Sequence, residues 1–145
     1  MPDRNSPETI IAFDFGLRRI GIAVGQDVTG SANPLGTVQN GDDGPDFESI
    51  GALIEEWRPQ RLIVGMPAHA DGSESGLAPA ILSFVRDLGR FELPVVTEDE
   101  RYTSLEAAQA LKNARQAGSR GRIGRDDIDA AAAVIIAERY LLRNL

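Results

Sequence analysis

The sequence predicts an α/β protein built on one mixed sheet, with an antiparallel hairpin first, parallel strands after it and helices flanking the sheet. Residues 9–15 and 20–25 are short runs of β-forming apolar residues, and the Gly-Leu-Arg-Arg between them suits a hairpin turn. Beyond residue 46, segments with helical spacing alternate with short apolar runs. A hairpin followed by such alternation is typical of a sheet with an antiparallel start.

The elements after the hairpin follow from periodicity and from turn residues. Apolar residues recur at helical spacing from Phe47 to Trp57, and Pro59 ends that helix. A later helix should place Ile81, Leu82, Val85 and Leu88 on one face. The other expected segments are an extended stretch at 34–38, a loop at 39–45, strands at 61–65 and 93–97, helices at 76–89, from about 103 and at 126–142, and a basic loop at 118–124.

Composition limits the class of protein. A chain of 145 residues fits a single domain, 1–145, with residues 1–8 expected to form a loose tail. No cysteine is present, which excludes thiol catalysis and thiolate metal sites. No apolar run suits a signal peptide or a membrane span, so we expect a cytoplasmic protein without membrane contacts.

The charge is uneven along the chain. The net charge of −7 argues against a protein that coats nucleic acid through bulk electrostatics, but not against an enzyme with one basic patch. Residues 107–124 contain no acid and four basic residues. Arg125 follows directly. Nucleic-acid contact is therefore expected in this stretch.

Asp14 is the most informative single residue. It interrupts an apolar strand, where an unpaired buried charge would cost several kcal/mol. Strand alternation places it on the face of Ile10 and Ala12. Gly16 follows and leaves room beside the carboxylate. The alternative is a structural aspartate that accepts hydrogen bonds from the turn.

Two further groups of acids follow. Glu98, Asp99 and Glu100 come directly after a buried strand, at the sheet edge where α/β proteins place ligand sites. We expect one of the three to be functional and the others to be structural or solvated. Asp129 begins an inward stripe of the last helix with Ala132, Ala133 and Ile136, whereas Asp126 suits an ordinary cap.

Three inward carboxylates from two strand ends and one helix are what two-metal phosphodiester hydrolysis requires. The candidate catalytic and metal-binding residues are Asp14, Asp129 and one of Glu98, Asp99 and Glu100. Mg²⁺ or Mn²⁺ suits such oxygen ligands, and the two cations would lie about 3.5–4 Å apart. His69 is the only histidine and lies in a predicted loop, so a zinc site is not expected.

Four segments, in this order, resemble the YqgF family of bacterial pre-16S rRNA nucleases, also called Holliday-junction-resolvase-like proteins. The matching segments are Ala-Phe-Asp-Phe-Gly-Leu-Arg-Arg-Ile-Gly-Ile-Ala-Val from residue 12, Val-Gly-Met-Pro from 64 with Asp-Gly-Ser from 71, Asp-Glu-Arg-Tyr-Thr-Ser from 99, and Ile-Asp-Ala-Ala-Ala-Ala-Val-Ile-Ile from 128. The resemblance extends over residues 10–142.

The resemblance implies a ribonuclease H-like fold, catalysis by a divalent metal and a role in processing the 5′ end of 16S rRNA precursors. By position, the family's first acid falls on Asp14, the glutamate of its Asp-Glu-Arg segment on Glu100 and its helix aspartate on Asp129. Glu98 lies outside that segment. The chain departs from the family in having Arg18 where lysine is usual, and in the extra acids at 126 and 127.

The predicted partner is RNA, with pre-16S rRNA first and structured DNA second. The residues expected to bind it are Arg18, Arg19, Arg101, Lys112, Arg115, Arg120, Arg122 and Arg125. One alternative is a junction-resolving DNA endonuclease, which must cut two symmetric strands and so needs a dimer. Another is a catalytically silent RNA- or ribosome-binding module. We expect a monomer or a weak dimer.

Overall fold

The computed structural model describes residues 8–27, 30–66, 78–99 and 125–143. For residues 99, 125–129 and 143 it describes the backbone alone. The helix expected from about residue 103 and the basic loop at 118–124 lie outside the described residues.

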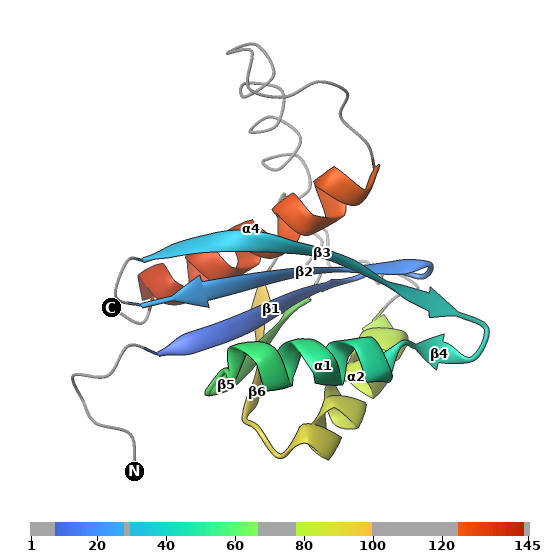
Figure 1. Cartoon of the computed structure of the whole chain (residues 1–145). Helices are drawn as coiled ribbons and strands as arrows, with labels where there is room; N and C mark the ends of the chain where they lie inside the picture. Colours follow the sequence, from blue (N-terminus) through green and yellow to red (C-terminus); the bar gives the residue numbers. More distant parts are fainter. Residues whose placement is uncertain (1–7, 28–29, 67–77, 100–124, 144–145) are drawn as a thin grey trace.

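The described strands form one six-stranded mixed sheet in the order β4-β3-β2-β1-β5-β6 (Figure 1). They are β1 (Thr9–Phe15), β2 (Arg19–Gln26), β3 (Ser31–Gly41), β4 (Gly44–Pro45), β5 (Arg61–Met66) and β6 (Val95–Asp99). The pairs β1–β2, β2–β3 and β3–β4 are antiparallel, whereas β1–β5 and β5–β6 are parallel. The antiparallel start and the parallel continuation confirm the predicted sheet.

Helices cover both faces of this sheet. One face carries α1 (Phe47–Trp57), α2 (Ala78–Asp87) and the short 3-10 helix η1 (Leu88–Phe91). The other carries α4 (Arg125–Arg143), which runs antiparallel to β1 (Figure 1). No helix among the described residues is both long enough and apolar enough to cross a membrane.

Side chains that alternate along the strands form the core under α1 and α2. Ile11 and Phe13 of β1 and Leu62 and Val64 of β5 are fully buried there. Phe84 of α2 joins them, with its ring 5.5 Å from that of Phe13 in an edge-to-face pair. Aromatic pairs of this kind stabilise a core beyond the area they bury.

The apolar face predicted for α2 is wrong at one position, residue 82. Leu82 is 55% exposed, whereas Phe84 is 1% exposed and takes its place in the core. Ile81 and Leu88 are buried as predicted. The helix is rotated toward Phe84 because the larger aromatic side chain removes more apolar area from water.

The second core lies under α4 and depends on small residues. Ala132, Ala133 and Ile136 of the predicted stripe are all buried. Ala137 and Leu141 continue it, and a Cβ added to Gly25 of β2 would lie 3.1 Å from Leu141 Cδ1 and 3.5 Å from Ala137 Cβ. The alanines and the glycine therefore let the helix approach the sheet closely.

The predicted loop at residues 39–45 is wrong in part. Residues 39–41 complete β3, which turns back into β4 through the pairs Asn40–Pro45 and Gly41–Gly44. Gly44 has a φ of 92°, a conformation that glycine adopts readily. The same residues that indicate a loop therefore make a tight hairpin. Asp46 follows the hairpin, and its backbone N–H donates to the Gln39 carbonyl of β3. Its side chain caps α1 by accepting hydrogen bonds from Ser49.

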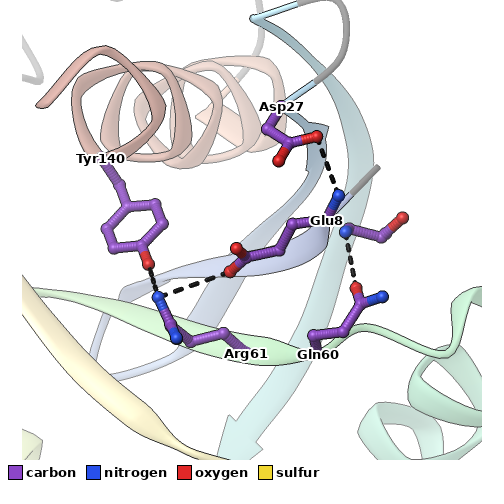
Figure 2. Close-up of polar contacts among 6 residues, drawn as sticks. Glu8, Asp27, Gln60, Arg61 and Tyr140 are labelled. Atoms are coloured by element: carbon purple, nitrogen blue, oxygen red, sulfur yellow. Dashed lines mark hydrogen bonds and ion pairs between the residues drawn. The ribbon is translucent and has the colours of Figure 1, made fainter. Parts of the chain in front are cut away.

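A polar cluster ties the starts of β1 and β5 to the last turns of α4 (Figure 2). Arg61 donates a hydrogen bond to the Tyr140 hydroxyl and lies 3.4 Å from the Glu8 carboxylate. The hydroxyl of Tyr140 raises the pKa of the Arg61 guanidinium. The Glu8 amide donates to Asp27 at 2.8 Å, and the Thr9 amide donates to the Gln60 side chain at 2.6 Å. The C-terminal part of α4 is thereby anchored to the end of the sheet where β1 and β5 begin.

Candidate active site

Asp14 lies near the C-terminal end of β1, on the face of the sheet that α4 covers. Ile10 and Ala12, which share its face by alternation, pack in the cluster under α4. Asp14 is half-buried. Its neighbour on β2 is Gly21, and the register that pairs Phe13 with Val64 brings Gly65 of β5 to its other side. Asp14 therefore has a glycine beside it on each adjacent strand.

The turn that follows Asp14 is tightly specified. A Cβ at Gly16 would lie 2.6 Å from the Arg19 carbonyl oxygen, a contact that no other residue could make without a backbone shift. The buried Asn40 donates its side-chain N–H to the Gly16 carbonyl at 2.6 Å. Its backbone N–H donates to the Arg18 carbonyl at 2.9 Å. One residue of β3 thus holds both ends of the turn.

Glu98 brings a second carboxylate to the same face. Val95 packs under the other face with α1 and α2, so Val96 and Glu98 point toward the α4 side. Glu98 pairs with Gly65, which is itself the neighbour of Asp14. It is only 5% exposed. Asp14, Gly65 and Glu98 therefore form one row across three adjacent strands.

The course of α4 brings its first turns toward this row. Ala137 packs over the Ile10–Gly25 pair, and Asp14 lies four residues further along β1, about 13 Å at 3.3 Å per residue. Asp129 lies eight residues before Ala137, about 12 Å at 1.5 Å per residue. α4 runs antiparallel to β1 (Figure 1). These two spacings therefore put the backbone at Asp129 toward the same end of the sheet as Asp14.

The other predicted site residues divide into two groups. Arg18 is exposed in the turn and Arg19 is half-buried at the start of β2. Arg125 begins α4, but its side chain, like that of Asp129, lies outside the described residues. The residues that lie wholly outside them are Glu100, Arg101, Lys112, Arg115, Arg120 and Arg122. Within the described residues, no group of three histidine, cysteine or acidic side chains could hold a metal.

Three features of the site were not predicted from the sequence. Gly21 could have been found, because it interrupts an apolar strand, whereas Gly65 lies two residues before Pro67 and so indicated only the end of its strand. Asn40 was hidden by the loop-like composition around it. The role of Glu98 was left open, because the residue lies outside the Asp-Glu-Arg segment; its even spacing from Val96 places it on the α4 side.

The arrangement defines a class of protein. Asp14 lies near the C-terminal end of β1, a central strand of a mixed sheet. Glu98 lies at the corresponding register position on β6, two strands away. A helix covers that face and carries a further acid in its first turns. Carboxylate oxygens are the groups that hard divalent cations prefer, and the described residues bring two of them, Asp14 and Glu98, to the same face of the sheet.

The chain belongs to the RuvX family, whose description is Holliday junction resolvase and whose model matches residues 8–143. A relative from Paraburkholderia xenovorans is 46% identical over 92% of this chain and 87% of its own length. One from Methylobacillus flagellatus is 41% identical over 96% and 94%. Both bear the name "Putative pre-16S rRNA nuclease".

Solved structures share the fold at low sequence identity. Thermus thermophilus RuvC, solved with a Holliday junction substrate, matches with a TM-score of 0.55 and 16% identity over 94% of this chain and 95% of its own. Fowlpox virus resolvase, solved with junction DNA, matches with a TM-score of 0.54 and 12% identity over 94% and 99%. The fold is that of the ribonuclease H-like resolvases, as predicted.

Proposed function

We propose that this chain is a metal-dependent nuclease that processes the 5′ end of 16S rRNA precursors. The observation that carries the proposal is the half-buried Asp14 at the end of the central strand, under the helix that bears Asp129. Membership of a family of phosphodiester-cleaving enzymes and the names of relatives at 41–46% identity support it.

The residues fit a divalent cation. Asp14, Glu100 and Asp129 would supply the carboxylate oxygens that Mg²⁺ or Mn²⁺ prefers, and the chain has no cysteine to favour a softer metal. When bound, such cations activate a water and stabilise the leaving oxygen of a phosphodiester. Neither adjacent strand places a side chain next to Asp14, because its neighbours there are Gly21 and Gly65.

The chain's own residues would orient the substrate. Arg18 is exposed in the turn directly after Asp14, where its guanidinium can hold a phosphate oxygen next to the carboxylates. The basic residues at 101 and 112–125 remain the predicted contacts for the rest of the RNA. The turn that bears Arg18 is held in place by Asn40.

A second candidate is cleavage of four-way DNA junctions. The family description and the two solved neighbours with junction DNA favour it. The same carboxylates would serve, but the enzyme would need a second copy to cut two symmetric strands.

One experiment separates these functions. Purified protein is incubated with precursor 16S rRNA and, in parallel, with a four-way DNA junction, each with Mg²⁺, Mn²⁺ or a chelator. We expect metal-dependent shortening of the rRNA 5′ end and little junction cleavage. Junction cleavage alone would favour the second candidate, and binding without any cleavage would indicate an RNA-binding module.

A further inference from the structure

Glu98 is a buried acid that the family resemblance does not explain. It precedes the Asp-Glu-Arg segment, and the sequence leaves open whether Glu98 shares the role of Glu100 or is a structural or solvated residue. The structure excludes the solvated alternative, because the residue is 5% exposed. A carboxylate taken out of water is costly unless it is paired or binds a cation. Both Glu98 and Asp14 have interactions within the protein, so a cation would join existing contacts.

The register relates Glu98 directly to Asp14. Both residues pair with or lie beside Gly65, and all three share the face under α4. Two strand spacings separate the backbones of the two acids by about 9.5 Å. Because Gly65 has no side chain, nothing from β5 stands between the two carboxylates.

A separation of about 9.5 Å between the two backbones allows the carboxylates of Asp14 and Glu98 to bind cations from opposite sides. Metal–oxygen bonds of about 2.0–2.6 Å on each side, with one cation or two about 3.5–4 Å apart, can span the space between an aspartate and a longer glutamate. A side chain at residue 65 would occupy the same space. We propose that Glu98 is a further metal-binding carboxylate of this site and faces Asp14 across Gly65; this inference rests on the proposed nuclease function.

The proposal is tested by Mn²⁺ binding, measured on the full chain by electron paramagnetic resonance of the free ion. The variants are Glu98→Gln, Asp14→Asn and, as a control, Glu55→Gln, which changes an exposed acid on the opposite face of the sheet. We expect Glu98→Gln to weaken Mn²⁺ binding at least about tenfold, the loss typical of removing even an outer partner of a metal site. Glu55→Gln should bind Mn²⁺ as the unchanged protein does.

The outcomes separate this inference from the proposed function. Unchanged affinity in Glu98→Gln together with a large loss in Asp14→Asn would overturn the role of Glu98 and leave the nuclease site intact. Unchanged affinity in both would overturn the metal site itself. If Glu98→Gln does not fold, Glu98→Asp keeps the charge and shortens the reach by one methylene. It should also bind Mn²⁺ more weakly, and unchanged affinity there would overturn the proposal.

Discussion

At the scale of single residues, the turn after Asp14 leaves no room for a side chain at Gly16. Gly16 faces the Arg19 carbonyl oxygen so closely that a Cβ would lie 2.6 Å from it. Backbone cannot move aside as a flexible side chain can. The position of Asp14, two residues earlier, therefore depends on a glycine at this turn.

Replacing Gly16 by alanine should lower the free energy of unfolding by about 1–3 kcal/mol, the range for forcing an extra methyl group into a packed site. Gly41→Ala is the matched control, because a Cβ there meets nothing within 4 Å. Urea unfolding of both variants measures the difference. Equal stability of the two would contradict the close contact.

Asn40 is the partner of that turn. Asn40→Ala removes the side-chain hydrogen bond to the Gly16 carbonyl, which is 2.6 Å long and part-buried. The expected loss of stability is about 1–3 kcal/mol, because a buried acceptor is left without its donor. Nuclease activity should fall further than stability alone explains, since the turn carries Arg18.

Asn33→Ala is the control for Asn40→Ala, because Asn33 lies on the same strand, β3, but is exposed. Urea unfolding and cleavage rates at a temperature where both variants are folded give the comparison. A loss in Asn40→Ala no greater than in Asn33→Ala would remove Asn40 from the positioning of the site.

At the scale of elements, α1 begins with a cap that responds to pH. Asp46 accepts from the Ser49 hydroxyl at 2.7 Å and from the Ser49 backbone N–H at 3.1 Å. These hydrogen bonds, the hydroxyl first, lower the pKa of Asp46 below its ordinary value. The stability that this carboxylate contributes is therefore present above its unfolded pKa and is lost as pH falls through the lowered, folded pKa.

Asp46→Ala should lower the melting temperature at neutral pH and have a smaller effect in acid, below the pKa of the folded aspartate. Melting curves of both proteins from neutral to acidic pH measure this convergence. Asp46→Asn is the control, because asparagine caps helices well without titrating. A constant difference between Asp46→Ala and the unchanged protein at every pH would show that the charge of Asp46 has no part in the cap.

Local pattern was sufficient to predict the elements that bear Asp14 and Asp129. Alternation in β1 and the alanine stripe of α4 each reflect a short-range rule, and both are confirmed by the buried residues. The roles of Gly65 and Glu98 depend on which strands are neighbours and in which register. That pairing is non-local, so no window of the sequence contains it. Asn40 was missed for the same reason, because its partners lie more than twenty residues away.

At the scale of the whole molecule, an acidic chain must bind an acidic substrate. The net charge of −7 makes long-range attraction to a nucleic acid weak, so we expect binding to depend on local basic residues. Arg18 and Arg19 lie beside the site in the structure. The basic stretch at 112–125 remains a prediction from the sequence.

Replacing Arg120 and Arg122 together by alanine should lower the slope of log affinity against log salt by up to about 2, at roughly one unit for each lost phosphate contact. Stability should hardly change, because charges in a loop such as the one predicted at 118–124 contribute little to folding. Filter binding of precursor rRNA at several salt concentrations, with Mg²⁺ replaced by Ca²⁺, gives the slope. Arg86→Ala, on α2, is the control, and an equal slope in both variants would move the binding face elsewhere.

The proposed function requires Asp14 to hold the metal with which this chain cuts RNA. The most direct test is the single-turnover rate of 5′-end cleavage of precursor 16S rRNA with saturating Mg²⁺, compared between the unchanged protein and Asp14→Asn. We predict a loss of at least about a hundredfold, the scale of removing one electrostatic stabiliser of a transition state. The variant should still bind the RNA and melt no lower than the unchanged protein without metal, since one of several neighbouring charges is gone. Cleavage by Asp14→Asn at the unchanged rate would contradict the claim.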